Sequence, residues 1–285
     1  MKLFTKTFGC QMNFADSDEM GQAFAKRGFS KTEDAEVADA ILVNTCTVRE
    51  LAEHKAMSFI GRLREWKALG AGRMIVVTGC AAERAKTDIE RRFDHVDLVV
   101  GAKDIEAFPA RLGEFLASER PEVETDESLV PAALVPGLPS DVVQYVTIMR
   151  GCNYSCTYCI VPSVRGRELY RPVEDIVTET ANRVAAGARE IWLLGQTVNS
   201  YRPEGRPGYE FADLLRDVAA VPNLERLRFI SPHPFYLNDK LVRAMAEVPQ
   251  VCPHVHLPVQ SGSDAVLKRM RRTYTSAAYL ASVDR

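Results

Sequence analysis

Short apolar segments alternate with amphipathic segments twice along this 285-residue chain, and this alternation limits the possible fold more than any other feature. The strands predicted in the first series are residues 2–9, 40–45, 73–79 and 96–101. The helices predicted from apolar residues at three- and four-residue spacing are 16–27, 48–69 and 81–93. Strands that alternate with helices form a parallel sheet covered on both faces, so the pattern predicts an α/β fold.

A second alternating series follows the first and predicts a separate domain. Its predicted strands are residues 143–150, 190–195, 224–230 and 254–259. Its predicted helices are residues 173–187, 209–220, 238–247 and 264–283. Four βα units are too few to close an α/β barrel, so we expect a partial barrel that is C-terminally incomplete.

The segment between the two series has the composition of a linker. Residues 118–140 hold four prolines and five acidic residues without periodicity, which resists packing into a core. The expected organisation is an N-terminal α/β domain with an open parallel sheet at residues 1–118, a linker at 119–140 and the partial barrel at 141–285.

The composition excludes several classes of protein. The 46% hydrophobic and 26% charged content is that of a globular protein, and no apolar run approaches the ~20 residues that span a bilayer. The first ten residues lack the apolar core of a secretory signal, so we expect a cytoplasmic protein without a membrane partner. Thiols stay reduced there, and the seven cysteines therefore indicate metal binding or catalysis rather than disulfides.

Three cysteines, Cys152, Cys156 and Cys159, stand close together in CNYSCTYC, directly after a predicted strand. Parallel α/β folds place ligand sites at the C-terminal ends of strands, and thiolates suit zinc or iron–sulfur clusters. A zinc site would need a fourth ligand from further along the chain. The candidates for that ligand are His233, Cys252, His254 and His256. An iron–sulfur site with one open position, or a set of inert buried cysteines, are the other interpretations.

A second set consists of Cys10, Cys46 and Cys80, which are far apart in the sequence. Each directly follows the end of a predicted strand, after TFG, VNT and VTG. Loops at one edge of a sheet converge, and helix N-termini there favour anionic thiolates. We therefore expect a cluster site, with inert core cysteines as the alternative. The seventh cysteine, Cys252, is expected to lie in the core.

The C-x₃-C-x₂-C spacing after the first strand of a barrel-like series resembles the radical S-adenosylmethionine (SAM) enzymes. The resemblance implies that these cysteines hold three irons of a 4Fe-4S cluster and that the open iron binds SAM, which is cleaved to a 5′-deoxyadenosyl radical. The residues that the resemblance places near SAM are Tyr158, between two of the ligands, and Gly195, Gln196 and Asn199 in LLGQTVNSY. Core packing of the tyrosine and ordinary turn chemistry of the others are the alternatives.

Longer segments resemble the methylthiotransferase family, which combines an N-terminal cluster domain, a radical SAM barrel and an RNA-binding domain. The resemblance rests on FGCQMN, VNTC, TGC and MRGCNYSCTYCIVPSVRGRE; GQTVNSY and HLPVQSGSD are closest to the branch that modifies isopentenyladenosine (dimethylallyladenosine) in tRNA. It implies a second 4Fe-4S cluster, held by Cys10, Cys46 and Cys80, which carries the sulfur to be methylated. The implied reaction inserts a methylthio group at carbon 2 of N6-isopentenyladenosine beside the anticodon.

The same resemblance implies a tRNA anticodon stem-loop as partner, an external electron donor of the flavodoxin or ferredoxin type, and a monomeric enzyme. Four arginines around the cysteine loop fit a phosphate backbone locally, although the formal net charge of the chain is only -2. Of these, we expect Arg165 and Arg167 to contact the substrate. A solvated surface is the alternative, above all for the basic run KRMRR at 268–272.

Two other functions remain open at this point. Within the family, the acceptor could instead be a threonylcarbamoyl-adenosine tRNA or an aspartate of a ribosomal protein. A non-enzymatic iron–sulfur protein, either an electron carrier or an RNA binder, would explain the cysteines without SAM.

Overall fold

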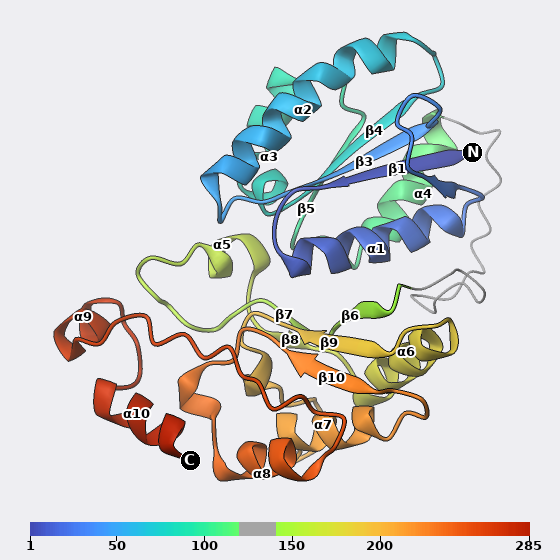
Figure 1. Ribbon diagram of the computed structural model, residues 1–285. Coiled ribbons are helices and arrows are strands. Elements are labelled where there is room, and N and C mark those ends of the chain that lie inside the picture. The colour runs from blue at the N-terminus through green and yellow to red at the C-terminus, as the bar shows by residue number, and fades with distance from the viewer. Residues whose placement is uncertain (120–140) are drawn as a thin grey trace. The chain divides into compact units, whose positions relative to one another are not determined.

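The computed structural model describes residues 1–119 and 141–285, which form two compact units (Figure 1). Of the described residues, the first unit contains 1–119 with Ser163–Arg165, and the second contains 141–162 with Gly166–Arg285. Apart from Glu119, the predicted linker lies outside the described residues. The expected α/β fold class is confirmed. Within the described residues, no helix is both long and apolar enough to cross a membrane.

Five parallel strands form the sheet of the first unit in the order β2-β1-β3-β4-β5. The strands are β1 (Lys2–Thr7), β2 (Ser30–Thr32), β3 (Ala40–Thr45), β4 (Met74–Gly79) and β5 (Leu98–Gly101). β3 and β4 are buried along their whole length, as continuous apolar strands are when both faces of a parallel sheet are covered. The sequence pattern predicted every strand of this sheet except β2.

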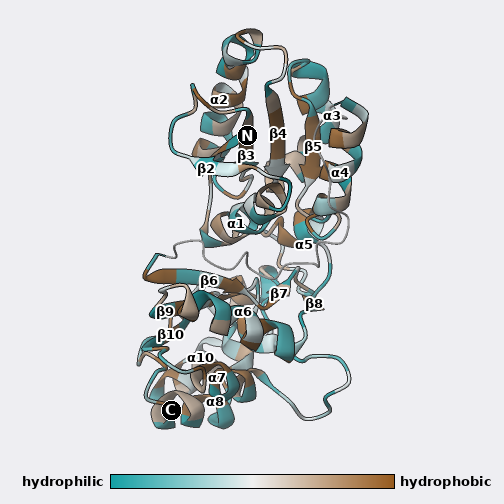
Figure 2. Ribbon diagram, turned by 90° about the vertical axis from the view of Figure 1, so that its right-hand side faces the viewer, coloured by the Kyte–Doolittle hydropathy of each residue, from teal (hydrophilic) through white to brown (hydrophobic). Residues whose placement is uncertain are grey.

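Helices cover both faces of this sheet (Figure 1). They are α1 (Gln11–Ala25), α2 (Glu50–Ala68), α3 (Cys80–Arg92) and α4 (Phe108–Glu119). Successive strand residues point to opposite faces and so divide the core into two layers. Leu42 and Val76 belong to the layer with α1 and α4, whereas Val43 and Val77 belong to the layer with α2 and α3. The strong apolar colour of β4 and β5 in Figure 2 reflects this double covering.

The second unit contains a parallel sheet of three strands and a short antiparallel pair. The sheet order is β10-β9-β6, from β6 (Val143–Thr147), β9 (Glu190–Leu194) and β10 (Arg226–Phe229), and the pair is β7 (Met149–Arg150) with β8 (Leu169–Tyr170). Its longer helices are α6 (Val173–Ala185), α7 (Phe211–Ala219), α8 (Asp239–Glu247) and α10 (Ser276–Asp284), and its shorter ones are α5 (Val161–Arg165), α9 (Asp264–Arg269), η1 (Val198–Ser200) and η2 (Pro234–Tyr236). One hydrophobic core joins the sheet to α6, α7 and α8.

The strand predicted at 254–259 is wrong. The chain makes only an isolated parallel bridge beside β10, between Leu227 and Val251, a few residues earlier than predicted. Pro253 and Pro258 lack the backbone N–H that a strand inside a sheet must donate, so the apolar pattern does not continue into pairing.

Two other predicted elements are interrupted. The strand predicted at 143–150 divides at Ile148 into β6 and β7, because β7 leaves the parallel sheet to pair with β8. The helix predicted at 264–283 is broken between α9 and α10, where Arg271 adopts a positive φ of 56°. Residues other than glycine seldom adopt this left-handed backbone conformation, which ends a helix.

Candidate functional site

The first unit brings Cys10, Cys46 and Cys80 together at the C-terminal edge of its sheet; we call them the N-terminal cysteine triad. Cys10 precedes α1, Cys46 follows β3 directly, and Cys80 begins α3 directly after β4. A Cβ built on Gly9 would lie 3.0 Å from the Cβ of Cys46, so the Cys10 loop packs against that residue. Cys46 also lies near enough to Cys80 to act on its thiol electrostatically. Two thiols are buried and that of Cys10 is exposed.

A buried network of side-chain amides holds the loops of this triad in place. The Oδ1 atom of Asn13 accepts hydrogen bonds from the backbone N–H of Cys10 at 3.2 Å and from its thiol at 3.4 Å. The Nδ2 group of Asn13 donates to Asn44 Oδ1 at 2.9 Å and to the carbonyl of Thr45 at 3.2 Å. Asn44 in turn donates to the carbonyl of Asn13 at 2.8 Å. No pattern in the sequence predicted this network, although GCQMN and VNTC contain both asparagines.

Gly79 is required by the backbone where β4 meets α3. Its φ of 99° and ψ of -169° belong to a region that only glycine adopts without strain. A Cβ on this residue would lie 2.7 Å from the backbone nitrogen of Thr45 and still closer to its carbonyl oxygen. The absence of a side chain therefore lets the loops that carry Cys46 and Cys80 approach each other.

Arg165 and Asp16 form a buried ion pair in the first unit. The Nη2 atom of Arg165 lies 2.8 Å from Asp16 Oδ2, and both side chains are almost completely buried. Burial raises the pKa of the Cys80 thiol to about 11, and the positive charge of Arg165 opposes that rise. The Nη1 atom of Arg165 is buried without a hydrogen-bond partner among the described residues. The predicted substrate residue Arg165 thus lies beside Cys80, and Arg167 is exposed.

The second unit presents Cys152, Cys156 and Cys159, the central cysteine triad, in the loop that follows β7. Gly151 starts this loop with φ of 77°, and a Cβ there would lie 2.5 Å from the carbonyl carbon of Arg167. The backbone N–H of Cys159 donates to the carbonyl of Cys156 at 3.0 Å, which closes a tight turn. Burial and the two neighbouring thiols raise the pKa of Cys159. The three thiols are therefore near neighbours in a loop that remains partly exposed.

The residues predicted to contact SAM lie near this loop to different degrees. Gly195 packs against Met149 of β7, since a Cβ on it would lie 2.5 Å from Met149 Cγ. The Oε1 atom of Gln196 is buried without a hydrogen-bond partner in the described part of the chain. Asn199 exchanges two hydrogen bonds with the backbone of His233, at 2.7 and 3.0 Å. The side chain of Tyr158 is about half exposed.

Two contacts beside the central triad were not predicted. The hydroxyl of Thr197, in the loop between β9 and η1, lies 3.4 Å from the Cys152 thiol. Tyr154, inside the cysteine loop, stacks on the imidazole of His233 with ring centroids 4.3 Å apart. Burial, together with the charge of Arg272, lowers the pKa of His233 to about 3, so this imidazole is neutral at physiological pH.

The described residues contain no preformed set of ligands for a zinc ion. Among the described residues, no group of three or more histidine, cysteine, aspartate and glutamate side chains could hold a single metal ion. Of the candidate fourth ligands, His233 is stacked on Tyr154 and Cys252 is half-buried rather than fully in the core. A four-iron cluster places its cysteines on different irons, so it needs a wider thiol spacing than one zinc ion does.

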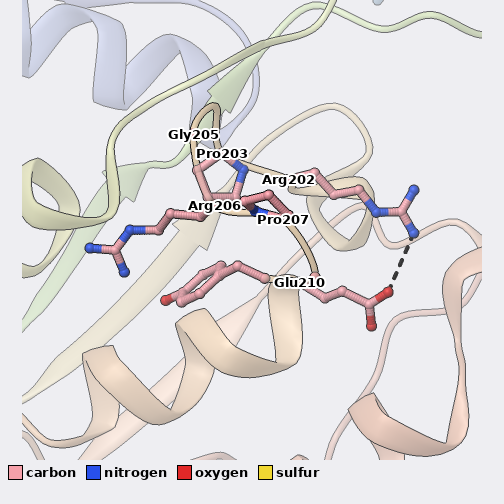
Figure 3. Close-up of a pocket in the computed structure, with 8 residues that line it drawn as sticks. Arg202, Pro203, Gly205, Arg206, Pro207 and Glu210 are labelled. Carbon is pink, nitrogen blue, oxygen red and sulfur yellow. Dashed lines mark hydrogen bonds and ion pairs between the residues drawn. The ribbon is translucent and has the colours of Figure 1, made fainter.

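The loop 202–210, after β9, lines a pocket of about 420 Å³ that is open to solvent (Figure 3). Its arginines are already paired: Arg202 lies 3.5 Å from Glu210, and Arg206 forms an ion pair with Glu174. The positive charge of this pocket is therefore compensated within the protein.

Two family models match the chain, one on each side of the predicted linker. Residues 2–101 match the family described as "Uncharacterized protein family UPF0004", and residues 146–285 match the "Radical SAM superfamily". The two matches contain the N-terminal and the central cysteine triad, respectively.

Curated relatives resemble the chain along its whole length. The tRNA-2-methylthio-N(6)-dimethylallyladenosine synthase of Anaeromyxobacter sp. (strain K) is 45% identical over 100% of this chain and 61% of the relative. The protein of the same name from Endomicrobium trichonymphae is 44% identical over 98% of this chain and 64% of the relative. The chain thus spans a little over three fifths of the length of these relatives.

Solved structures share the fold at low sequence identity. The radical SAM methyltransferase TsrM from Kitasatospora setae, with tryptophan substrate and a SAM analog bound, has a TM-score of 0.67 and 14% identity, over 99% of this chain and 65% of TsrM. The cobalamin-dependent radical SAM enzyme OxsB, with aqua-cobalamin and SAM bound, has a TM-score of 0.63 and 14% identity, over 99% of this chain and 47% of OxsB.

Proposed function

Because the chain belongs to the radical SAM methylthiotransferase family, we propose that it is a member of the tRNA-modifying branch of that family. In this proposal it catalyses the insertion of a methylthio group at carbon 2 of N6-isopentenyladenosine beside the anticodon. One observation supports the proposal above all others. Each of the two units brings three cysteines together just past the ends of strands. Three thiolates can hold a four-iron cluster with one iron open to another ligand.

The N-terminal triad fits such a cluster in its donor chemistry and its backbone. The thiols come from three loops at one sheet edge, and Cys80 stands in the first turn of α3, where the helix dipole favours negative charge. Asn13 fixes the Cys10 loop by accepting the backbone N–H, and Gly79 leaves room for the loops to meet. The residues of the chain thus preorganise the thiols, which in our proposal hold the cluster that carries the transferred sulfur.

The central triad fits the second cluster. In our proposal Tyr158, Gly195, Gln196 and Asn199 surround SAM at its open iron. The buried Oε1 of Gln196 is an acceptor of the kind that an ammonium group needs, whereas Asn199 acts through the backbone of His233. When bound, this cluster would supply the electron that cleaves SAM to a radical. A radical can activate an adenine C–H bond, which acid–base catalysis cannot do. The hydroxyl of Thr197 stands beside the Cys152 sulfur.

The substrate proposal rests on the relatives and on local charge. In our proposal the exposed Arg167 contacts the phosphate backbone, and the buried Arg165, beside Cys80, serves the substrate at the N-terminal triad. The partners proposed are a tRNA anticodon stem-loop and an electron donor of the flavodoxin or ferredoxin type. We further propose that the protein acts as a monomer and in the cytoplasm, where tRNA is modified.

Mass spectrometry of tRNA nucleosides tests the proposed acceptor. A strain that lacks the gene should lose 2-methylthio-N6-isopentenyladenosine and accumulate N6-isopentenyladenosine, and the returned gene should restore both levels. Unchanged methylthio-isopentenyladenosine in the deletion strain would refute the acceptor. Loss of a methylthiolated threonylcarbamoyl-adenosine instead would assign the chain to the other tRNA substrate of the family.

A further inference from the structure

The segment that follows α9 lies directly on the central cysteine loop, within the second unit. The backbone N–H of Thr157, between Cys156 and Tyr158, donates to the carbonyl of Met270 at 3.3 Å. The hydroxyl of the same threonine donates to the carbonyl of Arg269 at 3.2 Å. This part of the basic run 268–272 is therefore docked on the loop, although its sequence is also compatible with a solvated helix face.

Arg272 is the residue of this run whose side chain reaches a cysteine. Its Nη1 donates to the Cys156 sulfur at 3.3 Å. Its Nε donates to the hydroxyl of Tyr274 at 3.3 Å, and its guanidinium lies 5.2 Å from the centre of that ring. The Tyr274 hydroxyl donates to the carbonyl of Val259 at 2.9 Å. The hydrogen bonds to Cys156 and Tyr274, together with the fixed Tyr274 ring, thus hold the Arg272 guanidinium in one orientation.

We propose that Arg272 is a positioning residue that raises the reduction potential of the cluster at the central triad, through its hydrogen bond to the Cys156 sulfur. The inference rests on the proposed function, because Cys156 must be a cluster ligand. Reduction adds a negative charge to the cluster and its thiolates. A fixed positive donor stabilises the reduced state more than the oxidised state, as hydrogen bonds to cluster sulfurs do in general.

The neighbouring arginines separate this effect from general charge. Arg269 and Arg272 belong to the same basic run, but the side chain of Arg269 is exposed and that of Arg272 is half-buried. A charge that water screens contributes little at a distance, whereas a donor in contact with sulfur acts in a less polar environment. Arg269→Leu is therefore the matched control for Arg272→Leu.

A redox titration followed by electron paramagnetic resonance, without SAM, tests the inference. The N-terminal triad is replaced by alanines so that one cluster gives the signal, and the iron content of each sample is measured. Arg272→Leu should disfavour reduction about tenfold, which corresponds to a midpoint about 59 mV more negative for one electron. Arg272→Lys, which keeps a positive donor, should shift the midpoint less, and Arg269→Leu should leave it unchanged.

Equal midpoints in Arg272→Leu and the parent, with equal iron, would overturn the inference and leave the proposed function intact. If SAM binding, measured separately, is lost while the midpoint is unchanged, the inference is also overturned, because Arg272 would then act on SAM itself. If Arg272→Leu fails to retain the cluster, Arg272→Gln decides, since it keeps a donor without the charge and should still shift the midpoint to a more negative value. A parent protein that holds no reducible cluster at the central triad would overturn both proposals.

Discussion

Gly79→Ala should destabilise the first unit and disturb the N-terminal triad. The residue joins β4 to α3 with φ of 99°. The added methyl group would lie 2.7 Å from the backbone nitrogen of Thr45, closer than Cβ atoms come to neighbouring groups, and closer still to Asn44 Oδ1. The methyl group would therefore clash with the backbone of Thr45, which cannot move without a cost in free energy, and with the amide network that orients Cys10.

Two physical costs add up in this variant. A non-glycine residue in this backbone region costs about 1–3 kcal/mol, and overpacking of a rigid site costs about 1–3 kcal/mol more. The expected loss of unfolding free energy is therefore about 2–6 kcal/mol. Gly28→Ala is the matched control, because Gly28 also has a positive φ, 78°, but nothing lies within 4 Å of its Cβ position. It should cost only about 1–2 kcal/mol.

Tryptophan fluorescence can follow the first unit alone. The chain has two tryptophans; Trp66 lies in α2 of the first unit and Trp192 in β9 of the second. Urea unfolding in a Trp192→Phe background thus reports on Trp66, which is buried. If Gly79→Ala lost no more stability than Gly28→Ala, the close approach of the two loops would not constrain the fold.

Three further predictions concern separate parts of the structure. Replacement of the central triad by alanines should leave about four irons per chain, in place of about eight, and abolish 5′-deoxyadenosine formation; SAM cleavage by that variant would disprove the site. Asn13→Ala leaves the Oδ1 atom of Asn44 without this donor and should cost about 1–3 kcal/mol in the Trp66 assay; an unchanged urea midpoint would contradict this. Burial opposes ionisation of Glu190, but the hydrogen bonds from Arg226 and Trp192 prevail and lower its pKa. The ionised Glu190 therefore stabilises the fold above the ordinary carboxyl pKa of about 4.3, and this contribution is lost as the pH falls through the lower pKa of the folded state. Glu190→Gln should flatten this acid loss in urea titrations of the second unit, and an unchanged pH profile would exclude Glu190 as its source.

The sequence predicted the elements whose pattern depends on burial alone. AILVNT and MIVVTG each begin with a continuous apolar run, which is typical of a strand covered on both faces, and β3 and β4 are those strands. The strand β2 was missed because SKT is short and polar and lies at the sheet edge. The helix α4 was missed although Phe108, Leu112 and Leu116 repeat at four-residue spacing, since the pattern ended at the predicted linker.

The candidate site divides in the same way. Cysteines at strand ends could be predicted to converge, because parallel topology alone brings strand ends together. Contacts made by long polar side chains could not be predicted. The bond from Arg272 to Cys156 spans 116 positions, and the Asn13–Asn44 pair spans 31. No periodicity encodes such pairs, which depend on loop geometry that only the folded chain defines.

Separation of the two halves of the chemistry would show whether the N-terminal triad serves sulfur delivery and the central triad SAM cleavage. The measurement is the formation of 5′-deoxyadenosine and of methylthiolated tRNA by protein in which Cys10, Cys46 and Cys80 are replaced by alanine, after anaerobic reconstitution. We expect 5′-deoxyadenosine still to form, because the central triad is untouched, and the methylthiolated product to disappear. Product formation at the rate of the unsubstituted protein would show that these three cysteines have no part in sulfur delivery.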